Sequence, residues 1–186
     1  MSELRSALNG AHFDGYVLVS EGDPRGMIQL RADLGQDAVS TAVQKVAGAS
    51  LPQPLGHSQG ERGEVLWMSP DELLILLPPS AVGNGVEALE RDLDGLHHLA
   101  VDVSDLRAEI RLEGAAVREV LAKVAPVDMA QLEVGTVRRT RIGQVPAAMW
   151  LSDAETAHVL CFRSVAAYVF GVLSVSARKG GEVGAF

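Results

Sequence analysis

The chain has 186 residues, of which 47% are hydrophobic and 22% are charged, a balance typical of a folded globular protein. This length suits one domain or two small fused ones. The formal net charge is −8, whereas a general nucleic-acid binder needs a basic surface to displace counterions from phosphate. The composition therefore argues against nucleic acid as a partner.

The cysteine content and the hydropathy indicate the cellular compartment. One cysteine, Cys161, cannot form an internal disulfide or a multi-cysteine zinc site, and it favours a reducing environment. Residues 1–9 contain no apolar run typical of a signal peptide, and no run approaches the roughly 20 residues that span a bilayer. We expect a soluble, cytoplasmic protein without a membrane partner.

Apolar periodicity predicts four elements in the first half. Residues 25–34 alternate as in a strand with one buried face, and residues 39–46 have helical spacing. Residues 65–77 contain Ser-Pro-Asp between two apolar runs, which predicts a hairpin. Because the run 73–77 is apolar throughout, we expect a central strand covered on both faces. A second helix is predicted over about 81–93.

The second half repeats this order. Its predicted elements are a strand at 108–113, a helix at 117–124, strands at 137–142 and 145–151 around a Gly-Gln turn, a strand at 157–162, and a closing helix with Ser164 as its N-cap. Two strand–helix–strands–helix halves predict an α+β fold with largely antiparallel sheets. We place the halves at 1–99 and 100–177, as one compact unit with a flexible tail at 178–186.

The closing helix has no charged residue from Val165 to Val175. A soluble helix normally keeps a polar face toward water, so this helix is expected to be either wholly buried or partly covered by another protein. Tyr168 and Phe170 are the candidate interface residues, since burying such a side chain contributes roughly 1.5–3 kcal/mol.

Three arginines, Arg138, Arg139 and Arg141, concentrate positive charge in an acidic chain. Arg139 and Arg141 fall on one face of the predicted strand. They fit a clamp for a carboxylate or phosphate, or a contact with an acidic partner surface. An ordinary solvated strand face remains equally compatible with the pattern.

Two patterns resemble small-molecule sites. Gly83, Gly85 and Ala88 imitate a dinucleotide-binding loop, with Asp102 at the end of the next strand. No series of parallel strand–helix–strand units follows, so glycines that let a loop turn are favoured. Asp102, Ser104 and Asp105 are expected to cap a turn rather than supply a general base.

The remaining reactive side chains do not assemble into a predicted centre. Adjacent histidines at 97 and 98 point to opposite faces of a strand, and those at 12, 57 and 158 are isolated in the sequence. No spacing completes a zinc or iron site. Cys161 shares a strand face with apolar residues and is predicted to be a buried core residue despite the neighbouring Arg163. We therefore predict no catalytic, cofactor-binding or metal residues.

Several segments together resemble a known family. They occur in a characteristic order at 67–74, 101–107, 112–121, 125–129, 139–141 and 163–168. The chain resembles, over about residues 25–176, the gamma subunit of bacterial heterotetrameric sarcosine oxidase. That resemblance implies the fold of the folate-binding domain of aminomethyltransferases.

The resemblance also implies a role. The parent complex demethylates sarcosine oxidatively to glycine, with hydrogen peroxide and either formaldehyde or methylenetetrahydrofolate as products. FAD, FMN, NAD and zinc are expected in the partner subunits and none in this chain, which would be a noncatalytic subunit packed on alpha within a complex with beta and delta. A free-standing folate-binding protein of one-carbon transfer is the alternative, in which Asp102 or the arginines contact the ligand; a nucleotide enzyme using Gly83 and Gly85 is less favoured.

Overall fold

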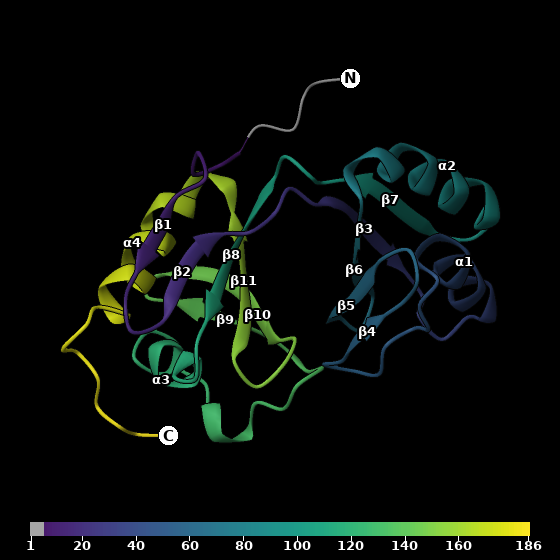
Figure 1. Cartoon of the computed structure of the whole chain (residues 1–186). Coiled ribbons are helices and arrows are strands. Elements are labelled where there is room, and N and C mark those ends of the chain that lie inside the picture. Colours follow the sequence, from purple (N-terminus) through teal and green to yellow (C-terminus); the bar gives the residue numbers. More distant parts are fainter. Residues whose placement is uncertain (1–5) are drawn as a thin grey trace. The chain divides into compact units, whose positions relative to one another are not determined.

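The computed structural model describes residues 6–186, and within them the chain forms two compact units, each with its own hydrophobic core (Figure 1). Unit 1 comprises residues 24–105. Unit 2 comprises residues 106–186 together with the described residues up to Asp23. Every strand pairing in both sheets is antiparallel, so the predicted α+β class is confirmed.

The division differs from the one expected at Leu99. The strand β7 (His98–Asp102) crosses that point and pairs with β3 (Gly26–Ala32), so it stays in unit 1. The early strand β2 (Leu18–Glu21) pairs with β8 (Arg107–Glu113), which places it in unit 2. Hydrophobic periodicity identifies strands but not their pairing partners. The placement of β7 in unit 1 and of β2 in unit 2 was therefore not predicted. That the halves form one compact unit stays a prediction.

Unit 1 is a five-stranded sheet in the order β4-β5-β6-β3-β7. Its remaining elements are β4 (His57–Gln59), β5 (Glu64–Ser69), β6 (Glu72–Leu77), α1 (Asp37–Ala47), the 3-10 turn η1 (Pro79–Ala81) and α2 (Val82–Asp92). All six residues of β6 are buried, as predicted for a central strand. Side chains of α1, α2, β3 and β6 form one core cluster.

Local chemistry fixes the ends of these elements. In the β5–β6 hairpin, Ser69 Oγ donates a hydrogen bond of 2.6 Å to Asp71 Oδ1, as the Ser-Pro-Asp turn predicts. The helix α1 ends at Ala47 and is capped by Gly48, which has a left-handed φ of 69° and donates its N–H to Gln44 O at 2.9 Å. Glycine adopts this conformation without steric cost.

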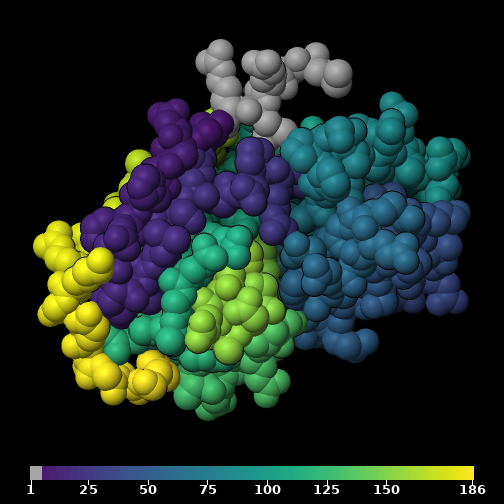
Figure 2. Space-filling view, viewed as in Figure 1, coloured from purple at the N-terminus to yellow at the C-terminus, as the bar shows by residue number. Residues whose placement is uncertain are grey.

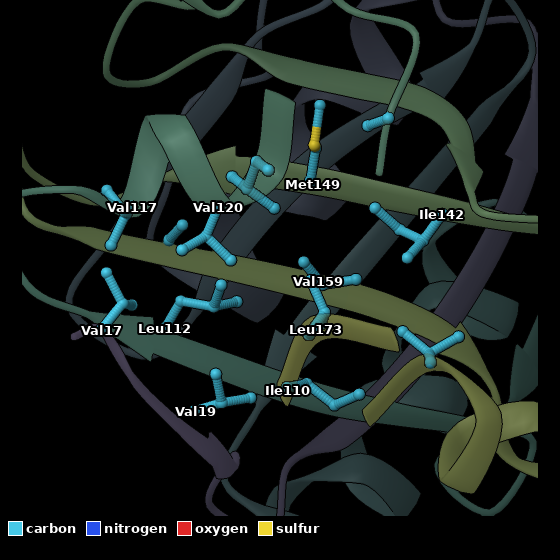
Figure 3. Close-up of a cluster of buried hydrophobic side chains, with 14 of the residues drawn as sticks. Val17, Val19, Ile110, Leu112, Val117, Val120, Ile142, Met149, Val159 and Leu173 are labelled. Atoms are coloured by element: carbon cyan, nitrogen blue, oxygen red, sulfur yellow. The ribbon is translucent and has the colours of Figure 1, made fainter. Parts of the chain in front are cut away.

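Unit 2 is a six-stranded sheet in the order β1-β2-β8-β11-β10-β9. Its other elements are β1 (His12–Asp14), α3 (Val117–Ala122), the 3-10 turn η2 (Met129–Gln131), β9 (Val137–Ile142), β10 (Val145–Leu151), β11 (Thr156–Phe162), the 3-10 turn η3 (Arg163–Val165) and α4 (Ala166–Ser176). One core joins the sheet to both helices and includes Val117 and Val120 from α3 and Leu173 from α4 (Figure 3).

Two expectations for the end of the chain differ from the structure. Ser164 lies inside the turn η3, and α4 begins at Ala166 with no side-chain cap, so the predicted N-cap is wrong. The tail, yellow in Figure 2, lies on the surface of unit 2. Backbone N–H groups of Val183 and Gly184 each donate to the Glu119 carboxylate at 2.8 Å, so this part of the predicted flexible tail is held in place.

Candidate protein interface

The helix α4 has two apolar faces with different surroundings. Its inner face is buried in the core of unit 2 and comprises Ala166, Val169, Leu173 and Ser176. The opposite face, called here the α4 outer face, comprises Ala167, Tyr168, Gly171, Val172 and Val175. Tyr168 is 43% exposed and Val175 is 64% exposed. The helix is therefore not wholly buried, and apolar surface remains for another molecule to cover.

An open hollow of about 750 Å³ lies along this face. The α4 outer face forms one part of its lining, and the rest comes from Lys123, Val124, Ser176 and Gly181. Gly171 lies here with nothing within 4 Å of the position that a Cβ would occupy. The lining of the hollow is mainly apolar, and Lys123 is its charged residue.

The β9–β10 turn positions Tyr168. Gly143 opens this turn with φ of 56°, as a two-residue hairpin loop requires, and Gln144 N donates to Tyr168 Oη at 3.3 Å. A Cβ on Gly143 would lie 2.6 Å from Tyr168 Oη, so the tyrosine would have to shift, and the positive φ itself favours glycine. Phe170 is half-buried and packs against the core of unit 2, so much of its ring serves the fold.

Beneath the hollow, a polar cluster fastens α3 to the tail. Lys123 Nζ donates to Tyr16 Oη at 2.8 Å and to Gly181 O at 2.6 Å, and it lies 3.2 Å from Glu119 Oε1. The N–H of Val183 is the main group that lowers the pKa of Glu119 to about 2; the N–H of Gly184 and the side chains of Lys123 and Tyr16 also favour the carboxylate. The sequence contains one sign of this cluster, the Glu119–Lys123 spacing of four residues.

The arginines lie on β9, which forms one edge of the sheet. Arg139 and Arg141 are exposed and pair in register with Ala148 and Pro146 of β10. Proline has no N–H, so this register puts the backbone groups of Arg141 on the side away from β10. Arg138 is half-buried and donates to Val137 O at 3.2 Å. The arrangement fits an acidic partner or a small anion, and the charges also protect the edge from unwanted strand pairing.

Both glycines of the imitation nucleotide loop lie inside α2, so the prediction that they let a loop turn is wrong, and of the two Gly85 has a packing role. Gly85 is buried, and a Cβ there would lie 2.8 Å from Ile28 Cδ1, so glycine brings α2 close to β3. The acidic turn is a cap: Asp102 Oδ1 accepts hydrogen bonds from Ser104 N at 2.9 Å and Ser104 Oγ at 2.6 Å. Ser104 Oγ in turn accepts from Met27 N at 2.9 Å. The turn-capping prediction is confirmed.

The sequence suggested that His158 is isolated, but in the structure it contacts other side chains. His158 Nδ1 lies 2.7 Å from Glu109 Oε1, its Nε2 lies 3.1 Å from Ser152 Oγ, and its ring stacks on Trp150 at 4.7 Å. These contacts imitate a catalytic triad, yet Ser152 N donates to Thr156 O and is not free to stabilise an oxyanion. We read the group as a partly buried polar network that the sequence could not reveal, because its members come from different strands and a turn.

Neither metal nor thiol chemistry finds support in the geometry. Among residues 6–186 no group of three or more His, Cys, Asp or Glu side chains is placed to hold a metal ion. Burial raises the pKa of the Cys161 thiol to about 11, consistent with the predicted core role. No helix in this part of the chain is long and apolar enough to cross a membrane.

The antiparallel sheets and their covering helices define a protein of the α+β class, and α4 of unit 2 presents an exposed apolar face. The chain belongs to the sarcosine oxidase gamma subunit family, which matches residues 31–178. It is 30% identical over 162 residues to the sarcosine oxidase subunit gamma of an Arthrobacter species, covering 84% of this chain and 78% of that protein. The subunit gamma of Corynebacterium sp. strain P-1 is 28% identical over 157 residues, covering 76% of each chain.

Solved structures agree on the fold. Heterotetrameric sarcosine oxidase from Corynebacterium sp. U-96, in complex with pyrrole 2-carboxylate, contains a chain with a TM-score of 0.81 and 23% identity, covering 93% of this chain and 94% of that one. Aminomethyltransferase T of the glycine cleavage system from Bartonella henselae has a TM-score of 0.63 and 12% identity, covering 86% of this chain and 45% of that one. The predicted family and the predicted aminomethyltransferase-like fold are both confirmed.

Proposed function

We propose that this chain is the noncatalytic gamma subunit of a heterotetrameric sarcosine oxidase and that it stabilises the assembled enzyme by packing on the alpha subunit. The complex would convert sarcosine to glycine, with hydrogen peroxide and formaldehyde or methylenetetrahydrofolate as products. FAD, FMN, NAD and zinc would reside in the partner subunits. Family membership supports the complex, and the α4 outer face is the observation that supports a packing role.

The energetics favour a lasting contact at that face. Full burial of a valine or aromatic side chain contributes roughly 1.5–3 kcal/mol. Val175 and Tyr168 retain 64% and 43% of their exposure, so a partner that covers both would recover about half of this for each. Obligate interfaces are apolar in this way and resemble a protein core cut in half.

Co-expression tests the proposal. The alpha, beta and delta subunits are produced with and without this chain, and yield, thermal stability and sarcosine-dependent peroxide formation are compared. We expect the chain to join the complex and its omission to lower yield and stability, while the purified chain alone is colourless and inert with sarcosine. A complete, equally stable complex formed without the chain contradicts the proposal.

A free-standing folate-binding function is the alternative. The exposed Arg139 and Arg141 favour it, since guanidinium groups suit the carboxylates of a glutamate tail. The aminomethyltransferase-like fold alone does not, because function depends on sites and not on folds. Calorimetric titration with tetrahydrofolate separates the alternatives: saturable heat that is lost in an Arg139→Ala/Arg141→Ala variant supports folate binding, and no heat at millimolar ligand removes it.

A further inference from the structure

We infer that the edge strand β7 of unit 1 pairs antiparallel with β7 of a second copy of this chain, about a two-fold axis at Ala100, and so joins the two five-stranded sheets into one. A sheet edge presents backbone N–H and C=O groups to which a further strand can bond. This pairing goes beyond the proposed function and does not depend on it, because it concerns unit 1 of the free chain.

Among residues 6–186 the two sheets end in four edge strands, which differ in their protection (Figure 1). The strands β1 and β4 have three residues each, and β9 carries three arginines; short length and charge both discourage pairing with another chain. The strand β7 has five residues, with Leu99 49% exposed and Val101 40% exposed. Residues 99–101 include no charge and no proline, and their register with β3 has no shift. Of these four edges, β7 is therefore the one open to a further strand.

The register of β7 with β3 determines which backbone groups point outward. Val103 N donates to Met27 O at 2.8 Å, and these two residues lie opposite each other in the register that pairs the two strands. Bonded pairs alternate with non-bonded pairs along an antiparallel ladder, so Leu99 and Val101 also direct their N–H and C=O groups to β3. The groups that point away from β3 belong to His98, Ala100 and Asp102.

These outward groups select one register for a second copy. When Ala100 faces Ala100 of the other copy, His98 faces Asp102, so each outward residue meets another outward residue and bonds to it. A shift of the register by two leaves one outward residue of each copy unused. A shift by one places outward groups opposite groups that already bond to β3. The backbone of β7 is thus complementary to itself about Ala100.

The side chains match in the same register. Leu99 lies opposite Val101 in both halves of the pair, at non-bonded positions, where side chains approach most closely. His98 lies opposite Asp102, so no like charges face each other directly. Since His98 Nε2 already lies 3.5 Å from Glu90 Oε2, the pairing depends on the backbone bonds and the apolar pairs and not on this charge. A second β7 meets both requirements, which is why a second copy is the occupant.

Self-association of the purified chain tests the pairing. Five residues from each copy make a small contact, so the dimer should be reversible and should increase between about 10 µM and 1 mM in sedimentation equilibrium. Val101→Lys places a charge on the edge and should weaken dimerisation by about tenfold or more. The matched control is Val134→Lys, at a valine that is 51% exposed in unit 2, and it should dimerise as the wild type does. Circular dichroism and Tm check that both variants are folded.

A disulfide experiment tests the register. The side chains of Leu99 and Val101 face each other only between copies, so a mixture of Leu99→Cys and Val101→Cys chains should cross-link under mild oxidation. Opposite non-bonded residues have Cα atoms about 4.5 Å apart, within the range of a disulfide. Either variant alone should cross-link about tenfold less, because like positions lie diagonally. The native Cys161 is buried and does not compete.

Three outcomes overturn the pairing. One is a chain that is monomeric at about 1 mM. Another is a dimer that Val101→Lys leaves unchanged, or one in which each cysteine variant alone cross-links as well as the mixture does. The third is a monomeric free chain whose Val101→Cys thiol is labelled more slowly in the co-expressed complex, which would show that a strand of another subunit is the occupant. None of these results bears on the proposed function, which fails instead when the wild-type chain does not enter the complex.

Discussion

Truncation to alanine should affect stability differently on the two faces of α4. A comparison of Leu173→Ala with Val175→Ala measures this difference. Leu173 is 0% exposed in the core of unit 2, so its truncation leaves a cavity that costs about 2–5 kcal/mol. For a chain of this length, each 1 kcal/mol corresponds to roughly 2–4 °C, which gives a loss of roughly 4–20 °C in Tm. Val175 is 64% exposed, and such substitutions stay within about 0.5 kcal/mol.

In the assembled enzyme the expectation for Val175 reverses. Covering its exposed part contributes up to about 1–2 kcal/mol, so Val175→Ala should weaken association by up to roughly 5–30-fold. Thermal unfolding of the isolated variants and titration of each into a complex of the other subunits measure the two quantities. A Val175→Ala chain as destabilised as Leu173→Ala, or one that is stable and associates normally, would refute the assignment of the two faces.

Three further predictions concern single groups. Burial alone would raise the pKa of Glu64, but hydrogen bonds and charge from His57 and Arg25 lower it from 4.5 to about 2. The stabilisation from this carboxylate is therefore complete above about pH 4.5 and is lost as the pH falls toward 2. After screening, we expect Glu64→Gln to lower the free energy of unfolding by about 1–2 kcal/mol, measured by urea unfolding at pH 7 and pH 3. Cys161 should resist aromatic disulfide reagents at pH 8 in the native chain and react fully in urea; fast native labelling would contradict its burial. Gly143→Ala should lower the free energy of unfolding by about 1–2 kcal/mol, because of the positive φ and the close approach to Tyr168 Oη. The loss should be seen as a lower Tm. An unchanged Tm would show that this turn does not position the tyrosine.

The local fold could be predicted because its signals are local. Alternation over residues 25–34 and the helical spacing over 39–46 report a buried face directly, and both became β3 and α1. Ser-Pro-Asp marks the hairpin because those side chains set the turn themselves. The pairing of β2 with β8 was hidden, because strand order depends on contacts between segments far apart in the sequence, such as Leu18 with Glu113.

The candidate interface could be predicted in part, because the lack of charge in α4 is also a local signal in the sequence. The absence of charge from 165 to 175 marks α4, but it cannot say which side faces the core, because an all-apolar helix has no polar stripe to orient it. The assignment of Tyr168 to the exposed side and Phe170 to a half-buried one needed the structure. The tail contacts of Glu119 were equally hidden, since backbone N–H groups of a glycine-rich segment leave no pattern in the sequence.

We propose that this chain works as a member of a larger enzyme and not alone. Native mass spectrometry of the enzyme purified through a tagged alpha subunit, after co-expression of all four chains, measures whether it does. We expect one copy of this chain in each heterotetramer, held through purification. A mass that corresponds to alpha, beta and delta alone, with this chain recovered separately, would contradict it.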